Sequence, residues 1–217
     1  MKNIKLLEEY NKDHSLFLYP NQNTDEASAE SMQYDLFLDA IKDITSEVPV
    51  MIELGVSHFP TYSRMFNTIF DNTCINICTE VRTSRLIEAK QKFPNGIFYH
   101  TYSGVPAHIQ EPLPDDHQEW NSTAGISNIP FKTLLNENNI EYVDMLHMDI
   151  QGSEVSLLEE LERDNLHKKI NYFCISIHEG CFDKCCSILE SWGVTYIFSS
   201  ATQGGWNDGL IVCKNNK

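Results

Sequence analysis

The amino-acid sequence predicts an α/β fold, a doubly wound and mostly parallel sheet of seven strands whose last strand is antiparallel. From residue 48 onward, short apolar runs alternate with segments whose apolar residues recur at helical spacing. Each run is apolar throughout, which is typical of strands in a parallel sheet that is covered on both faces. No helical segment separates the last two runs, so we expect these two strands to pair antiparallel.

The alternating pattern gives a position for each element. The predicted strands are residues 50–54, 74–79, 97–101, 142–150, 172–178, 194–198 and 210–212. The predicted helices are residues 62–70, 84–92, 131–136, 153–162 and 182–192, the last of which ends at Gly193 as a C-cap. The glycine-rich segment 203–209 joins the last two strands as a tight turn.

The first 48 residues precede this pattern. Residues 4–10 are predicted to form a short helix, residues 20–29 a polar loop, and residues 31–44 an amphipathic helix that packs on the α/β domain. A chain of 217 residues is long enough for one domain with a full core. We therefore predict an N-terminal helical extension over residues 1–48 and a single domain over residues 49–217, with the loop 103–129 on its substrate side.

The charge and the cysteines exclude several classes of protein. Acidic residues outnumber basic ones by 31 to 16, a net charge of −15, so neither nucleic acid nor an anionic membrane surface is an expected partner. No apolar run is long enough to span a membrane, and the N-terminal segment lacks the apolar stretch of a secretory signal. The seven cysteines are odd in number and lack zinc-site spacing, which favours reduced thiols in a cytoplasmic protein.

Carboxylates end the first two predicted strands. Ligands of open parallel sheets bind beyond the carboxyl ends of the strands, where the strand order switches. Glu53 ends the first strand and could take up a cationic or hydroxyl-bearing ligand, while Gly55 lets the backbone come close to that ligand. Glu80 ends the second strand, where a carboxylate is placed to accept hydrogen bonds from ribose hydroxyls. Alternatively, these residues form a plain turn and a solvated acid.

The fourth predicted strand carries the most specific motif. Its apolar run ends in Asp149-Ile150-Gln151-Gly152-Ser153-Glu154 and leads into an apolar helix. A carboxylate such as Asp149 at the end of a buried strand needs a partner, because an unpaired charge is costly there. Glu154 stands in the first helical turn, where the helix dipole also stabilises a negative charge without any catalytic role.

This motif resembles the FkbM family of class I S-adenosyl-L-methionine-dependent methyltransferases, in which an apolar strand runs into Asp-x-Glu-Gly-x-Glu. The resemblance extends to residues 129–135 and 175–179 and covers about residues 48 to 213. It implies methylation of a hydroxyl on a sugar, glycan precursor or secondary metabolite, with S-adenosyl-L-methionine as the cofactor. The residues that it implies as cofactor contacts are Glu53, Gly55, Ser57, Glu80 and Gln151.

Two positions depart from the family pattern. Gln151 replaces the first glutamate of the motif, and Phe59 stands where the first loop usually has a second glycine. A phenylalanine at this position either meets the methionine end of the cofactor or lies on a loop that swings aside. Both departures also fit a rival interpretation, in which the fold survives as a non-catalytic binding module. Another Rossmann-type nucleotide-binding enzyme is a weaker rival, because Gly-x-Gly-x-x-Gly is absent after the first strand.

Three residues are the predicted catalytic group: Asp149, His178 and Glu154. His178 ends the fifth predicted strand, where it could remove the proton of a substrate hydroxyl or serve only as a hydrogen-bonded structural histidine. We predict no metal. If a divalent ion were used to lower a hydroxyl pKa, the side chains available for it would be His147, Asp149, His178 and Glu179. By strand alternation, His147 is expected on the face opposite Met148 and on the same face as Asp149.

Overall fold

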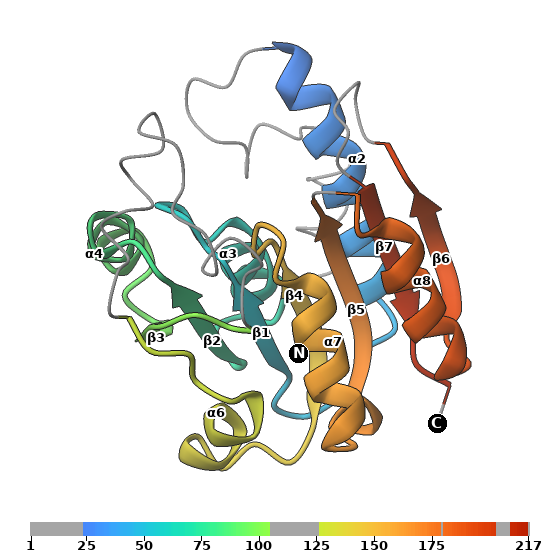
Figure 1. The fold of residues 1–217 in the computed structure, drawn as a ribbon. Helices are drawn as coiled ribbons and strands as arrows, with labels where there is room; N and C mark the ends of the chain where they lie inside the picture. Colours follow the sequence, from blue (N-terminus) through green and yellow to red (C-terminus); the bar gives the residue numbers. More distant parts are fainter. Residues whose placement is uncertain (1–23, 105–125, 179, 203–208, 217) are drawn as a thin grey trace, which may run out of the picture.

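The computed structural model describes residues 24–104, 126–178, 180–202 and 209–216. Its centre is a seven-stranded sheet with the strand order β3-β2-β1-β4-β5-β7-β6, as Figure 1 shows. The strands β1 to β5 are parallel, and β7 runs antiparallel to both β5 and β6. The predicted sheet is therefore confirmed, including its antiparallel last strand. The strands are β1 (Val50–Leu54), β2 (Ile75–Glu80), β3 (Ile97–His100), β4 (Val143–Met148), β5 (Ile170–Ile177), β6 (Thr195–Ser200) and β7 (Gly209–Lys214).

Helices cover both faces of this sheet (Figure 1). One face packs on α6, α7 and α8 through a core that includes Leu54, Leu146 and Phe173. The other face packs on α2 and α3 through Met51 and Met145, and α4 completes that side. The helices are α2 (Thr24–Ile41), α3 (Thr61–Ile69), α4 (Thr83–Lys92), α6 (Phe131–Glu137), α7 (Glu154–Arg163), the short 3-10 helix η4 (His167–Lys169) and α8 (Phe182–Ser191).

Helix α2 is part of this core. Its Tyr34, Phe37 and Ile41 are buried together with Leu210 and Val212 of β7. The prediction that this segment packs on the domain is confirmed, although the helix begins at Thr24 rather than at residue 31. The polar loop predicted over residues 20–29 is thus wrong from Thr24 onward, and the helix predicted over residues 4–10 lies outside the described residues.

The fourth strand ends earlier than predicted. Its last residue, Met148, pairs with Leu54, the last residue of β1. The backbone N–H of Asp149 still donates to the carbonyl oxygen of Leu54 at 3.0 Å. Because β1 ends at Leu54, residues after Met148 have no strand residue of β1 to pair with. Asp149 and Ile150 therefore belong to the loop between β4 and α7, and both line the pocket described below.

The cysteines form no disulfide bonds, because all seven are free thiols. Burial raises the pKa of the Cys174 thiol to about 12, so it remains protonated at neutral pH.

None of the helices in the described part of the chain is both long and apolar enough to cross a membrane.

Candidate active site

A pocket lies at the carboxyl ends of β1, β2, β3 and β4. It is lined by residues of the loops that come after these strands, including four that the sequence indicated: Gly55, Glu80, Asp149 and Gln151. In the sheet, β2 lies on one side of β1 and β4 on the other, so the pocket sits where the strand order switches direction. This is the general position of ligand sites in open α/β sheets.

Gly55 brings the first loop into direct contact with the loop after β4. Its φ is +81°, a left-handed conformation that favours glycine. A Cβ at this position would lie 1.9 Å from the carbonyl oxygen of Asp149, which no side chain can tolerate. The glycine therefore allows two loops to pack backbone to backbone at the floor of the pocket.

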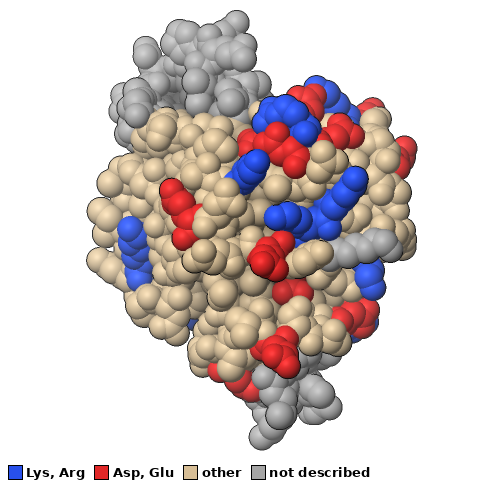
Figure 2. All heavy atoms as spheres, turned by 90° about the horizontal axis from the view of Figure 1, so that it is seen from below, with Lys and Arg blue, Asp and Glu red and all other residues tan. Residues whose placement is uncertain are grey.

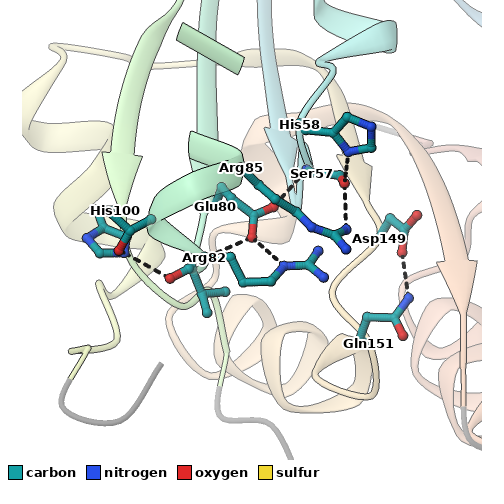
Figure 3. A network of polar contacts seen from close by, with 10 residues as sticks. Ser57, His58, Glu80, Arg82, Arg85, His100, Asp149 and Gln151 are labelled. Carbon is teal, nitrogen blue, oxygen red and sulfur yellow. Dashed lines mark hydrogen bonds and ion pairs between the residues drawn. The ribbon is translucent and has the colours of Figure 1, made fainter. Parts of the chain in front are cut away.

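The Glu80 carboxylate is held by three donors (Figure 3). Its side chain is only 2% exposed, and Oε2 accepts a hydrogen bond from the backbone N–H of Ser57 at 2.7 Å. Oε1 accepts from Arg82 twice, from the backbone N–H at 2.9 Å and from Nε at 3.1 Å. A carboxylate has about four acceptor positions. Two ribose hydroxyls can therefore bind Glu80 together only after the Arg82 side chain has moved away.

Ser57 is not among the residues that line the pocket, and it supports Glu80 through its backbone. It adopts a φ of 54°, and its backbone N–H donates to Glu80. Arg85 of α4 donates to the Ser57 Oγ at 2.8 Å, and His58 Nδ1 lies 3.0 Å from the same oxygen. Sequence reasoning missed both arginines; the available signal was the presence of two cationic side chains within five residues of the strand-end Glu80.

Glu53 faces helix α3 and not the pocket. It is buried, and its Oε2 accepts a hydrogen bond from the backbone N–H of Ser63 in the first turn of α3 at 2.7 Å. Burial raises the pKa of this carboxyl to about 7. Glu53 is not among the residues that line the pocket, so its observed role is to fix the start of α3 behind the first loop.

Phe59 is held away from the pocket. The guanidinium carbon of Arg64 lies over the Phe59 ring, 4.3 Å from the ring centroid. The Lys92 ammonium nitrogen lies 5.6 Å from the same centroid. Cationic groups of α3 and α4 thus bind the aromatic face. Phe59 is not among the residues that line the pocket.

The three predicted catalytic residues come together from different elements. Asp149 lies just after β4, Glu154 begins α7, and His178 lies just after β5. The buried Glu154 carboxylate places Oε1 at 2.9 Å from His178 Nδ1, and its Oε2 accepts from the backbone N–H of Gly152 at 2.9 Å. On the other side of the ring, His178 Nε2 lies 3.5 Å from Asp149 Oδ1. A carboxylate and an imidazole in this order can act as an oriented general base.

Gln151 lies between Asp149 and His178. Its amide nitrogen donates to Asp149 Oδ1 at 3.3 Å (Figure 3) and lies 3.0 Å from His178 Nε2. Asp149 has 42% of its side chain exposed, so this carboxylate remains accessible from the pocket. Gln151 itself has a φ of 50°, in the tight turn that carries the chain from β4 into α7.

His147 does not join this group. The predicted alternation holds, since Met148 packs in the core on the α7 side of the sheet. On the opposite face, His147 stacks on Tyr62 of α3, with the ring centroids 3.9 Å apart, and burial lowers its pKa to about 3. Glu179 lies outside the described residues. Among the residues that are described, no group of three or more His, Cys, Asp or Glu side chains could hold a metal ion.

Comparison with known proteins places the fold. No protein-family model and no curated protein matches this chain. The solved structure of the METTL16 methyltransferase domain (crystal form 2) is 15% identical, with a TM-score of 0.52 over 84% of this chain and 65% of that chain. The N-terminal domain of human METTL16 in complex with SAH is 16% identical, with a TM-score of 0.51 over 91% of this chain and 72% of that chain.

A third structure agrees with these two. The fibrillarin/Nop5p complex contains a chain that is 12% identical, with a TM-score of 0.50 over 84% of this chain and 81% of that chain. At such low identity these similarities concern the fold and leave the FkbM resemblance a prediction. The strand order, the antiparallel β7 and these neighbours together give this chain the fold of the class I S-adenosylmethionine-dependent methyltransferases.

Proposed function

We propose that this protein is an S-adenosylmethionine-dependent methyltransferase that methylates a hydroxyl group of a small molecule or carbohydrate. The observation that supports this proposal most directly is the convergence of Gly55, Glu80 and Asp149 on one pocket at the switch point of the sheet. These residues stand at the ends of three different strands, and the sequence alone indicates each of them. The fold itself is the second support.

The residues of the pocket suit the cofactor. Glu80 offers a carboxylate to the ribose hydroxyls once Arg82 has moved, and the half-exposed Asp149 offers a negative charge to the cationic end of the molecule. Phe59 contacts Arg64 and is not among the residues that line the pocket. When bound, S-adenosylmethionine supplies a methyl group whose bond to the sulfonium sulfur breaks with its electron pair leaving on sulfur, which yields S-adenosylhomocysteine.

The His178 imidazole is the base of the proposed reaction. Its Nε2 takes up the proton that the acceptor hydroxyl loses as the oxygen becomes methylated. Glu154 holds the ring through Nδ1 and is fully buried, so we assign it as a positioning residue. Asp149 stands 3.5 Å from Nε2 and orients the hydroxyl or the cationic cofactor.

The proposed acceptor is a hydroxyl on a sugar, a glycan precursor or a secondary metabolite, and the proposed compartment is the cytoplasm. The FkbM resemblance supports this class of acceptor. The net charge of −15 disfavours a nucleic-acid acceptor, because phosphates require cationic surface. On the face of the molecule shown in Figure 2, the Lys and Arg side chains of the described residues lie among Asp and Glu side chains and form no continuous basic surface.

One observation favours a second candidate, a non-catalytic descendant that uses the fold to bind a partner. The Arg82 side chain donates to Glu80 on the oxygen that a ribose hydroxyl would use. If this ion pair never opens, the cofactor cannot bind in the manner proposed. The two candidates therefore differ in one measurable property, the affinity for S-adenosylmethionine and S-adenosylhomocysteine.

Calorimetry with both compounds tests the proposal on three proteins: the wild type, Glu80→Gln and Glu88→Gln. Glu88 is the matched control, because it lies on α4, is half exposed and pairs with Lys92. We expect micromolar binding by the wild type and by Glu88→Gln, and at least a roughly tenfold loss, about 1.4 kcal/mol, in Glu80→Gln. Thermal unfolding of each variant verifies that it is folded. No binding at millimolar cofactor would overturn the proposal and leave the second candidate.

A further inference from the structure

We propose that Gln151 and Glu154 are positioning residues that hold His178 as a neutral imidazole, with its proton on Nδ1 and a bare Nε2. The proposal deepens the proposed function, since that bare Nε2 is the atom that would accept the proton of the acceptor hydroxyl. It concerns only the residues of this chain, and its test needs neither the cofactor nor an acceptor.

Glu154 determines the proton on Nδ1. Its side chain is fully buried, and its Oε2 is already bonded to the backbone N–H of Gly152. The second oxygen lies 2.9 Å from His178 Nδ1. An ionised carboxylate can only accept hydrogen bonds, so Nδ1 must carry a hydrogen for this contact to be favourable. Without that bond, the Glu154 carboxylate would be a buried charge with one of its two oxygens lacking a hydrogen-bond donor, which is costly.

Asp149 determines the orientation of the Gln151 amide. The amide nitrogen lies 3.3 Å from Asp149 Oδ1. Turning the amide over would place its oxygen against the carboxylate oxygen, where two acceptors repel each other. The NH2 group therefore faces Asp149, and its second hydrogen is available for the other neighbour.

That second hydrogen determines the state of Nε2. The same amide nitrogen lies 3.0 Å from His178 Nε2. An N–H donor that faces this atom requires a lone pair on it, so Nε2 carries no hydrogen. A single chain of bonds then runs from Asp149 through the Gln151 amide and the imidazole to Glu154, and each donor in it meets an acceptor.

The amide at position 151 opposes the effect of the surrounding charges. Among the described residues, two carboxylates face the His178 ring, Asp149 from the end of β4 and Glu154 from the start of α7. By themselves these charges favour the imidazolium form, which has no lone pair to accept a proton. On the side of α8, the backbone N–H of Cys181 donates to the His178 carbonyl oxygen at 3.2 Å and fixes the main chain. The Gln151 N–H opposes these charges, because a donor that faces Nε2 disfavours a second ring proton.

This arrangement gives the departure from the FkbM pattern a function. Where that family has glutamate, this chain has Gln151, and a glutamate here would place a third carboxylate beside the ring and favour the imidazolium. An acceptor hydroxyl can replace the amide as the donor to Nε2, because both present a hydrogen to the same lone pair. Gln151 thus keeps Nε2 in the state that the acceptor requires.

The test is an NMR measurement of both ring nitrogens at neutral pH, in full-length protein labelled with nitrogen-15 at histidine. The His178 signals are assigned by their loss in His178→Gln. We expect a protonated Nδ1 and a bare Nε2 in the wild type. In Gln151→Glu, we expect both nitrogens to be protonated in the majority of molecules. In Glu154→Gln, we expect the proton to move from Nδ1 toward Nε2.

His167 is the internal reference in every spectrum, because it is buried, stacks on Trp192 and bonds to the Leu161 carbonyl, away from position 151. Its signals should stay unchanged. A doubly protonated His178 in the wild type, or the same ring state in Gln151→Glu as in the wild type, would overturn the inference. Neither result would alter the calorimetric binding of S-adenosylmethionine, so failure here and failure of the proposed function are distinguishable.

Discussion

Arg82 donates through Nε to Glu80 Oε1 at 3.1 Å, and the same oxygen also accepts the Arg82 backbone N–H. The carboxylate that would receive the ribose is therefore already paired within its own turn. In the proposed function, the guanidinium and the ribose would compete for this oxygen, so breaking the ion pair would weaken cofactor binding.

Arg82→Ala is expected to tighten cofactor binding while weakening the fold. With the guanidinium gone, S-adenosylmethionine should bind roughly fivefold more tightly, about 1 kcal/mol, because one charge-assisted bond no longer has to break. Glu80 is almost fully buried, so loss of its partner should lower the free energy of unfolding by about 1–2 kcal/mol. Calorimetry and urea unfolding measure the two effects. Arg85→Ala is the control, since Arg85 bonds to Ser57 and leaves Glu80 paired; weaker binding by Arg82→Ala would contradict competition.

Gly55→Ala is expected to destabilise the protein by about 3 kcal/mol or more. The new Cβ would meet the Asp149 carbonyl oxygen at 1.9 Å, and the φ of +81° adds strain. Gly193→Ala separates the two causes, because Gly193 has a φ of +70° but nothing within 4 Å of a Cβ, and it should cost about 1 kcal/mol. Chemical denaturation compares the variants, and equal losses would mean that the contact with Asp149 does not matter.

Glu53 is expected to make stability fall as the pH rises. Its folded pKa of about 7 lies above the ordinary value of 4.5, so the folded state holds this proton more tightly than the unfolded chain. The resulting stabilisation is complete below about pH 4.5 and is lost as the pH rises to about 7, a change of about 3 kcal/mol. Glu53→Gln should lack this change. Urea unfolding from pH 5 to 8 should show the wild type losing free energy of unfolding relative to Glu53→Gln as the pH rises. A difference between the two proteins that stays constant with pH would falsify the raised pKa.

His147 has the opposite pH dependence. Its folded pKa of about 3 lies below the ordinary 6.5, so it contributes stability above pH 6.5 that is lost as the pH falls toward 3. The full difference is up to about 5 kcal/mol. His147→Phe keeps a ring that can stack on Tyr62 and removes the titration. Acid unfolding followed by circular dichroism should occur at lower pH in this variant, and an unchanged midpoint would show that other groups control acid unfolding.

The sheet was predictable because its buried strands are short runs of mostly apolar residues separated by segments with helical spacing. Val50–Leu54 was predicted at its observed bounds, and Gly193 does end α8, with a φ of +70° and an N–H that donates to Glu190. The end of β4 was not predictable from its own residues. It depends on where β1 stops, since Met148 pairs with Leu54 and Ile150 has no strand partner in spite of its apolar side chain.

Most residues of the candidate site could be predicted from the sequence, but the contacts between their side chains could not. Strand ends pointed to Glu80, Asp149 and His178. The contact of His178 with Glu154 depends on the pairing of β4 with β5, which brings together residues 24 apart in the chain. The direction of Glu53 could have been inferred from alternation, because Met51, two residues earlier, faces α3 as well.

The contact of Gly55 with the Asp149 carbonyl makes two loops into one rigid piece. A ligand that settles against the first loop cannot displace it without also displacing the chain that carries Asp149 and, two residues on, Gln151. Occupation of the two halves of the pocket should therefore be cooperative. By thermodynamic reciprocity, bound acceptor must then change the affinity for the cofactor by the same factor by which bound cofactor changes the affinity for the acceptor.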